Sequence, residues 1–525
     1  MKNEKLLRAI GDIDDALVSG AASDAKKRRM PRWARWTSAA AACLALVIAG
    51  GAFFLIRLGA SSGGGGDSDL VYMNYVGPVM PLTVRGDSSG ITAERDIDFD
   101  FSPYISTTES YETEDGEIRY YEASRTEVMV TDAYTLTNES AEDRTVTLLY
   151  PVIANVSARE YFPEITVDGQ PASLTLHPGP YTGGFSGAWG SGREGSINIA
   201  QLSSFEGYQT LLADDSYLRS AFDEFPAMDA PVTVYRLHDF VYSAAESANP
   251  TLSMEFYIDF EKTYVFTYGM NGASFDYDTG FCSRIKGGIE YRPNARENRR
   301  YPDDGYVIIL GDDLKEYTVQ GYMDGGCDAG EELDDLSCTV TRYECTLGEI
   351  VSELLGGYLG ETYPAEENPA SANAAPAPEY MREIYLGLTA ELLYSYGQLG
   401  QFPVERYDTG MLEEIFSDVN SGERIIYFAF DAVIPAGGSV SVKAAMLRDE
   451  SCDFIGKDRG RDGYDMASRL GSNIGFTRAG ASISGYDEIE IVQQNFGFDI
   501  KNGVTQVSLD LNEPHYYLEV RKIVR

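Results

Sequence analysis

Histidine is the residue that most often binds metals or transfers protons near neutral pH, and this chain of 525 residues has only three. His177 precedes Pro178 in a turn-like stretch, and His515 follows Pro514 in another. His238 lies in a strand-like stretch, so no two histidines stand at the helical spacing of metal ligands. We therefore predict no metal site, no cofactor and no catalytic residue among them.

Two glycine-containing motifs resemble catalytic or phosphate-binding signatures only in part. Residues 190–195 spell GxGxxG, but a strand-like stretch follows instead of the helix whose N-terminus would bind a phosphate. Ser186 lacks the second glycine of a nucleophile elbow. We predict that the protein is not an enzyme. A hydrolase with two carboxylates stays an alternative, because carboxylates that meet only in space leave no sequence pattern.

Four acidic residues have the spacing of a calcium-binding loop, at its first, fifth, ninth and twelfth positions: Asp324, Asp328, Glu332 and Asp335. Gly326, Ala329 and the final Asp335 break the required pattern. Asp96, Asp98 and Asp100 alternate in the way that the solvated face of a strand does. We interpret both sets as a charged surface that keeps the protein soluble, with calcium binding as the alternative.

The tripeptide Arg85-Gly86-Asp87 is the one that integrins bind. Three residues recur by chance in long chains, and Ser88, Ser89 and Gly90 follow directly. We predict a turn here.

Five cysteines follow residue 57, and an odd number leaves at least one thiol unpaired or paired with another chain: Cys282, Cys327, Cys338, Cys345 and Cys452. The three between 327 and 345 are close enough in sequence for one local disulfide. The alternative is that all five are reduced.

Charge is distributed unevenly along the chain, whose formal net charge is −40. Residues 1–57 hold ten Lys or Arg against five Asp or Glu, which leaves 32 bases and 77 acids in residues 58–525. Nucleic-acid binding needs clustered bases, so we predict no nucleic-acid partner. The two parts of the chain are suited to different environments.

The run from Thr37 to Ile56 has 20 residues without one charge, which as a helix spans about 30 Å, the thickness of a bilayer core. Basic and aromatic residues of a membrane interface precede it: Lys26, Lys27, Arg28, Arg29, Arg32, Trp33, Arg35 and Trp36. Only Arg57 follows it directly. The positive-inside rule then predicts a single-pass membrane protein, with a cytoplasmic N-terminus and the acidic part outside.

Other targeting signals fit this segment less well. A cleaved signal peptide has its basic residues at the start of the chain, whereas 36 residues precede this run. Arg28 and Arg29 are followed by Met30 and Pro31, which do not fit the pattern of a twin-arginine signal. Cys43 lies within the apolar run, whereas the cysteine of a lipidation signal follows such a run.

Residues 3–22 predict an amphipathic helix with one apolar stripe: Leu6, Ile10, Ile13, Leu17 and Ala21. The polar face is net acidic through Asp12, Asp14 and Asp15, which suits an anionic lipid surface poorly. An isolated helix of this length is marginally stable in water. We predict that the stripe, with Asp14 and Asp15, binds in a groove of a cytoplasmic partner.

This helix, followed by a basic patch and one span, resembles the N-terminus of single-pass anti-sigma-factor-like proteins of Gram-positive Firmicutes. The motif residues are Leu6, Leu7, Ile10, Gly11, Ile13, Asp14, Asp15, Leu17, Val18 and Ala21. The resemblance implies that the helix holds a sigma factor at the membrane and releases it on an outside signal. Zinc-binding members carry a His and paired Cys that residues 1–57 lack, so binding would use the bare helix.

Beyond the span, alternating stretches rich in Tyr, Val, Ile and Thr predict mostly β structure, in antiparallel sandwich-like sheets. Helical periodicity at Thr346–Leu359 and Glu379–Leu399 interrupts it, around a Pro- and Ala-rich loop at 362–378. The predicted organisation is a cytoplasmic segment (1–36), a transmembrane helix (37–57), a Gly/Ser linker (58–69), a β-rich region (70–345), a helical segment (346–420) and a C-terminal β-rich region (421–525). Alternatively, the helices are an insertion in one sandwich completed by residues 424–525.

We therefore expect a membrane signalling protein, an anti-sigma-factor-like regulator whose cytoplasmic helix binds a sigma factor or another cytoplasmic regulator. Its outer β-rich region would sense an envelope signal through an unknown extracellular ligand. The alternative is a membrane-anchored surface protein that binds carbohydrate or protein, since 36 Tyr and 23 Phe suit carbohydrate stacking as well as they suit cores.

Overall fold

The computed structural model describes residues 72–112, 118–182, 184–186, 198–200, 202, 204–245, 249–289, 304–362, 379–400, 405–454, 458 and 460–523. The chain divides into two compact units, residues 1–68 and 69–525, and every described residue belongs to the second. The predicted cytoplasmic helix, the transmembrane helix and the linker all lie outside the described residues. Within the described ranges, none of the helices combines the length and the apolar character that crossing a bilayer requires.

The described part is mostly β, as the alternating sequence patterns predicted. Two long strands, β6 (Val128–Asn138) and β7 (Arg144–Ala154), are joined by the short connection at residues 139–143. Every second residue of β6 is buried, as in a sheet with one face on a core. The two strands do not pair with each other, because β6 and β7 belong to different sheets.

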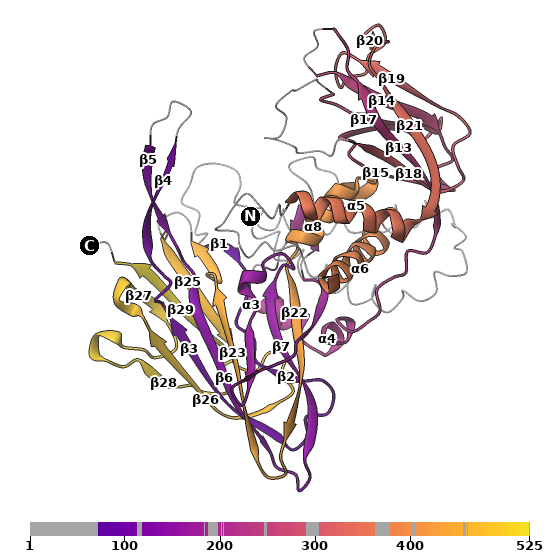
Figure 1. Cartoon of the computed structure of the whole chain (residues 1–525). Coiled ribbons are helices and arrows are strands. Elements are labelled where there is room, and N and C mark those ends of the chain that lie inside the picture. Colours follow the sequence, from indigo (N-terminus) through magenta and orange to yellow (C-terminus); the bar gives the residue numbers. More distant parts are fainter. Residues whose placement is uncertain are drawn as a thin grey trace, which may run out of the picture. The chain divides into compact units, whose positions relative to one another are not determined.

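Three sheets share the first core (Figure 1), which also continues into the helices and a fourth sheet described below. A seven-stranded sheet has the order β28 (Gln506–Ser508), β26 (Gly475–Ser484), β3 (Ile91–Asp100), β6, β23 (Ser439–Arg448), β8 (Glu164–Val167) and β9 (Gln170–Pro171). The β22 sheet has the order β10 (Thr175–Tyr181), β22 (Arg424–Ile434), β7 and β2 (Thr83–Val84). The β25 sheet has the order β1 (Tyr72–Tyr75), β24 (Cys452–Phe454), β25 (Arg461–Ala467), β29 (His515–Lys522) and β27 (Ile489–Gln494).

A buried ion pair ties these three sheets together. Arg95 of β3 donates from Nε and Nη2 to the Asp132 carboxylate of β6, at 2.9 and 2.8 Å. Tyr150 of β7 donates to the same carboxylate, and Arg95 donates to the Ala467 carbonyl of β25 at 2.6 Å. Because buried charges need such partners, the network favours one arrangement of the sheets.

Strands from both ends of the described chain share these sheets. β22 pairs with β7 over eleven residues, from Arg424 opposite Ala154 to Ile434 opposite Arg144. β23 pairs with β6, and β1 pairs with β24. The predicted regions 70–345 and 421–525 are therefore continuous in space at this core. β26 lies parallel to β3, which differs from the antiparallel pairing that the sequence predicted.

Two further sheets pack on a second core, which includes Leu237, Phe256, Cys282 and Val307. The β13 sheet has the order β15 (Thr263–Tyr268), β18 (Gly305–Gly311), β13 (Pro231–Val241) and β21 (Ser337–Thr346). The β14 sheet has the order β16 (Gly272–Asp276), β17 (Phe281–Lys286), β14 (Thr251–Tyr257), β19 (Tyr317–Tyr322) and β20 (Glu332–Leu333). Two small hairpins also form, β4 (Ser106–Glu112) with β5 (Ile118–Ser124), and β11 (Gly184–Ser186) with β12 (Asn198–Ala200).

Helices cover sheet faces that point away from a sheet partner. Tyr208 of α3 (Phe205–Leu211) and Tyr217 of α4 (Ser216–Ser220) pack on the β22 sheet. α5 (Leu347–Thr362), α6 (Glu379–Ser395) and α8 (Leu412–Ser421) pack on the β13 sheet, where Phe266 and Ile308 join the same cluster as Leu354. α7 (Glu405–Asp408) precedes α8, and short 3-10 helices lie at Arg159–Tyr161, Tyr486–Glu488 and Ile500–Asn502.

The start of α5 is fixed by a reciprocal pair of hydrogen bonds. Thr346 Oγ1 accepts from the Glu349 backbone N–H at 3.2 Å, and Glu349 Oε2 accepts from the Thr346 backbone N–H at 2.8 Å. This capping box satisfies two donors that a helix N-terminus leaves unpaired. The helices α5 and α6 begin within one residue of the positions that the periodicity predicted.

Candidate functional site

The predicted site residues all lie outside the described residues. This holds for the partner-binding stripe within residues 6–21 and for the basic and aromatic membrane interface within residues 26–36. The sites that the structure describes are therefore those of the β-rich region.

His177 and His238 each have a local structural role. The ring centroids of His177 and Phe222 are 4.3 Å apart. Burial lowers the pKa of His177. His238 contacts Asp239 Oδ2 through Nδ1 at 2.8 Å and Thr341 Oγ1 through Nε2 at 2.7 Å. Across the described ranges, no group of three or more His, Cys, Asp or Glu is placed to hold a metal ion.

His515 belongs to a polar cluster on the β25 sheet. Its Nε2 lies 2.7 Å from Asp465 Oδ2, and Tyr75 donates to the same oxygen at 2.6 Å. The His515 ring stacks on Phe205, with ring centroids 4.0 Å apart. Burial, and then the Asp465 charge, raise the pKa of Tyr75 far above its usual value. The carboxylate thus orients an imidazole and a phenol, as it does in many structural clusters.

Cys452 lies near this cluster but is a poor nucleophile. Burial, followed by the negative charge of Asp465, raises the pKa of the Cys452 thiol far above its usual value. Because the thiolate is the reactive form, a thiol that stays protonated does not attack an acyl group. The arrangement supplies a His and an Asp without an activated cysteine.

The expected local disulfide does not form. Cys282, Cys327, Cys338, Cys345 and Cys452 are all free thiols. Cys338 and Cys345 both lie on β21, where seven residues at about 3.3 Å each hold them roughly 23 Å apart. Sequence proximity suggested a bridge that the extended strand prevents.

Three of the four acidic residues with calcium-loop spacing accept hydrogen bonds that hold nearby segments of the chain in place. Asp324 Oδ1 accepts from the Gly326 backbone N–H, and Glu332 Oε2 accepts from the Gly330 N–H, both at 2.8 Å. Asp335 accepts from Ser243 Oγ at 2.6 Å and from the Ala244 N–H. These three carboxylates stabilise the backbone around them.

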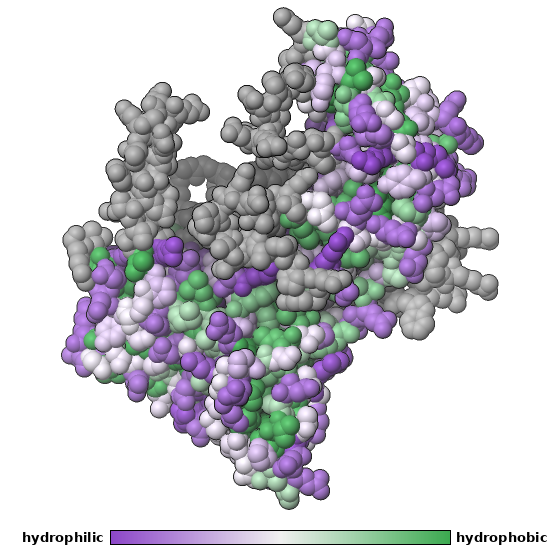
Figure 2. All heavy atoms as spheres, in the orientation of Figure 1, coloured by the Kyte–Doolittle hydropathy of each residue, from purple (hydrophilic) through white to green (hydrophobic). Residues whose placement is uncertain are grey.

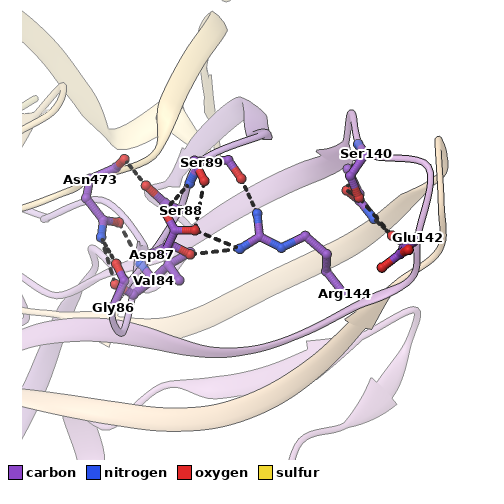
Figure 3. A network of polar contacts seen from close by, with 10 residues as sticks. Val84, Gly86, Asp87, Ser88, Ser89, Ser140, Glu142, Arg144 and Asn473 are labelled. Atoms are coloured by element: carbon purple, nitrogen blue, oxygen red, sulfur yellow. Dashed lines mark hydrogen bonds and ion pairs between the residues drawn. The ribbon is translucent and has the colours of Figure 1, made fainter.

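Residues 85–87 form a turn whose charged ends have partners within the protein. Arg144 donates to the backbone carbonyls of Asp87 and Ser89 and lies 3.6 Å from the Asp87 carboxylate (Figure 3). The Asp87 carboxylate also accepts from the Ser89 N–H and hydroxyl, at 3.0 and 2.8 Å. The Arg85 guanidinium lies 4.0 Å over the Phe222 ring. The tripeptide is therefore built into the surface, and its Arg and Asp are not presented as a free pair.

Asn473 fixes this turn from the other side. Its amide nitrogen donates to the carbonyls of Val84 and Gly86 at 2.9 Å, and its amide oxygen accepts from the Val84 N–H at 3.0 Å (Figure 3). One asparagine thus satisfies three backbone groups that lie almost 390 residues away in sequence.

A polar pocket opens on the outer face of the seven-stranded sheet, and we call it the Asp98 pocket. Its volume is about 460 Å³, within the range of small-ligand sites, and its lining includes Asp98, Ser482, Ser484, Tyr486, Thr505 and Gln506. The Ser482 hydroxyl donates to Asp98 Oδ1, and the Ser484 hydroxyl donates to Asp98 Oδ2 at 3.1 Å.

Strand alternation creates the Asp98 pocket. Ile97, Phe99 and Ile483 point into the first core, so Asp98, Ser482 and Ser484 point to the opposite face. The parallel register places Ser482 beside Asp98. Gly485 at φ +62° then turns the chain where a side chain would meet Asp100 and Ser102.

Only half of this pocket could be recognised from local sequence patterns. It showed the alternating acids on β3, of which Asp96 pairs with Arg478 and Asp100 accepts from Ser102. Nothing local linked them to Ser482 and Ser484, almost 390 residues later.

Exposed aromatic rings form a second candidate surface on the β14 sheet. The Tyr257 and Tyr277 side chains are 62% and 67% exposed. The ring centroids of Tyr277 and Phe260 are 4.7 Å apart, and those of Tyr257 and Phe281 are 5.6 Å apart. Elsewhere, on the face shown in Figure 2, hydrophilic and hydrophobic residues are interspersed, as is usual for protein surfaces.

Comparison with known proteins gives no match: no family model, no curated protein and no solved structure is significantly similar to this chain.

Proposed function

We propose that this protein is a single-pass membrane regulator, similar to anti-sigma factors, whose cytoplasmic helix binds a sigma factor and whose outer β-rich region responds to an envelope ligand. The observation that carries the proposal is the order of segments in residues 1–57. An apolar helical stripe, a basic and aromatic interface, and an uncharged run of 20 residues follow one another. A stripe on so short a helix needs a partner to cover it.

The β-rich region fits the role of a ligand-binding outer part. It offers the Asp98 pocket and the exposed tyrosines, and its acidic composition suits a protein surface outside the cytoplasm. A pocket together with a separate helix for a cytoplasmic partner is what a transmembrane signalling protein requires.

The test is capture of a sigma factor by the full-length chain in host membranes. Ile10→Asp with Leu17→Asp places two charges on the apolar stripe. Each buried aliphatic side chain contributes roughly 1.5–3 kcal/mol, so we expect capture to fall by more than tenfold. Mass spectrometry of the cross-linked complex identifies the partner.

The matched control is Lys5→Gln with Arg8→Gln on the polar face of the same helix, which should leave capture unchanged. Equal capture by both variants, with membrane insertion intact, would contradict a role for the stripe.

The second candidate is a membrane-anchored surface protein that binds carbohydrate or protein, in which the N-terminal segments serve only as an anchor. The exposed rings of Tyr257 and Tyr277 favour it, because aromatic faces stack on sugar rings. If this candidate is right, Ile10→Asp with Leu17→Asp changes neither sigma-factor capture nor any other cytoplasmic activity, and the outer region still binds its ligand.

A further inference from the structure

The hydrogen-bonding character of the Asp98 pocket restricts what it can bind. Because the Ser482 and Ser484 hydroxyls donate to Asp98, their remaining lone pairs are acceptors. The pocket therefore presents mainly acceptors near Asp98, and it suits a ligand with several hydroxyl or amide donors.

The charge of the pocket excludes anionic ligands. Asp98 and Asp487 contribute carboxylates, and none of the described residues that line the pocket is Lys or Arg. A phosphate, sulfate or carboxylate ligand would meet repulsion without a compensating cation. The ligand is therefore neutral or positively charged.

The geometry favours a neutral ligand over an ammonium ion. Both Asp98 oxygens already accept from serine hydroxyls, so the carboxylate charge is shared in these hydrogen bonds. Besides Asp487, the lining includes the neutral side chains of Tyr486, Thr505 and Gln506. A phenol ring beside hydroxyl and amide groups matches a sugar ring, which has apolar C–H faces and hydroxyl edges.

We propose that the Asp98 pocket binds a neutral saccharide unit. This inference rests on the proposed function, since it names the class of ligand to which the outer region responds. Asp98 holds the two serine hydroxyls in position, these accept from sugar hydroxyls, Gln506 donates and accepts at the rim, and Tyr486 packs on the ring.

The experiment uses the full-length chain in lipid nanodiscs, because glycoside detergents would themselves occupy a sugar site. The probes are glucose, galactose, mannose, N-acetylglucosamine and a β-1,4-linked N-acetylglucosamine tetramer, each up to about 20 mM. Saturation-transfer NMR detects binding, and titration calorimetry measures the affinity. We expect at least one probe to bind, with an affinity independent of salt, because a neutral ligand is not screened.

The variants test the pocket itself. Asp98→Ala should lower the affinity at least tenfold. Gln506→Ala changes an exposed side chain outside the core and should lower the affinity at least threefold. Asp96→Asn is the matched control on the same strand and face, two residues away and outside the pocket, and it should bind like the native protein.

Three results would overturn the inference: no probe binds, binding is equal in Gln506→Ala and in the native protein, or methylammonium binds in a salt-dependent way while the saccharides do not. Each leaves sigma-factor capture by the cytoplasmic helix unaffected. A failure here is therefore distinguishable from a failure of the proposed function.

Discussion

One buried glutamate and two half-buried ones have pKa values near neutral pH. Burial raises the pKa of Glu413 and of Glu423 to about 7, and that of Glu450 to about 8, where Asp449 adds to the effect. Glu413 accepts a hydrogen bond from the Gly269 backbone N–H, which joins α8 to the end of β15. At the residue scale, these groups make stability depend on pH.

The sign of this dependence follows from the unfolded state, in which a glutamate ionises near pH 4.5. Between about pH 4.5 and 7 the unfolded chain loses these protons first, so stability falls as the pH rises. Glu423→Gln should reduce the difference in unfolding free energy between pH 5 and pH 8, by up to about 3 kcal/mol. Thermal unfolding of both proteins at each pH measures it.

His177 acts in the opposite direction, because its lowered pKa favours the folded state as the pH rises. The comparison of variant with native protein cancels this contribution. A Glu423→Gln protein with the same pH slope as the native protein would show that Glu423 is not a buried ionisable group.

At the scale of elements, the sequence predicted where strands and helices lie but not which strands pair. Residues 128–138 alternate between apolar and polar side chains, and this pattern identified β6. A strand with one buried face shows this pattern in its own sequence, whichever strand it pairs with. β7 follows β6 after a short turn, yet it pairs with β22, almost 300 residues later. Pairing is set by long-range packing, which one sequence does not record.

The candidate site shows the same limit. Asp98 was visible as one of three alternating acids, whereas its contacts with Ser482 and Ser484 depend on the parallel pairing of β26 with β3. The predicted disulfide among Cys327, Cys338 and Cys345 was wrong, since all three are free thiols. Cys338 and Cys345 are close along an extended strand but not in space.

The capping box of α5 is an element whose contribution can be measured. Thr346→Ala removes the side chain that accepts from the Glu349 N–H, and loss of an N-cap costs about 1 kcal/mol. We expect faster hydrogen exchange of the amides in the first turn of α5. Glu353→Ala, at an exposed position on the same helix, should leave this exchange unchanged. Equal exchange in the Thr346→Ala and native proteins would contradict the role of the cap.

At the scale of the whole molecule, the first core depends on both ends of the described chain. β22 completes the sheet that contains β7, β23 completes the sheet that contains β3 and β6, and β25 and β29 complete the sheet that contains β1. A chain that ends at residue 420 would expose the apolar faces of these earlier strands.

We therefore expect residues 69–420 to aggregate or remain unfolded, while residues 69–525 give a cooperative thermal transition. Circular dichroism and size-exclusion chromatography distinguish these results. A soluble, folded fragment ending at residue 420 would show that the shared sheets are not required for stability.

The short edge strand β1 has a mechanical consequence. Everything between the N-terminus and the first core is connected through this strand, whose register with β24 consists of three residue pairs. Tension along the chain from residue 71 would load these few hydrogen bonds first and peel β1 from the sheet edge, while the long β22–β7 ladder carries no load. The Tyr75 to Asp465 hydrogen bond would break in the same event, so β1 would act as the weakest link when the protein is pulled.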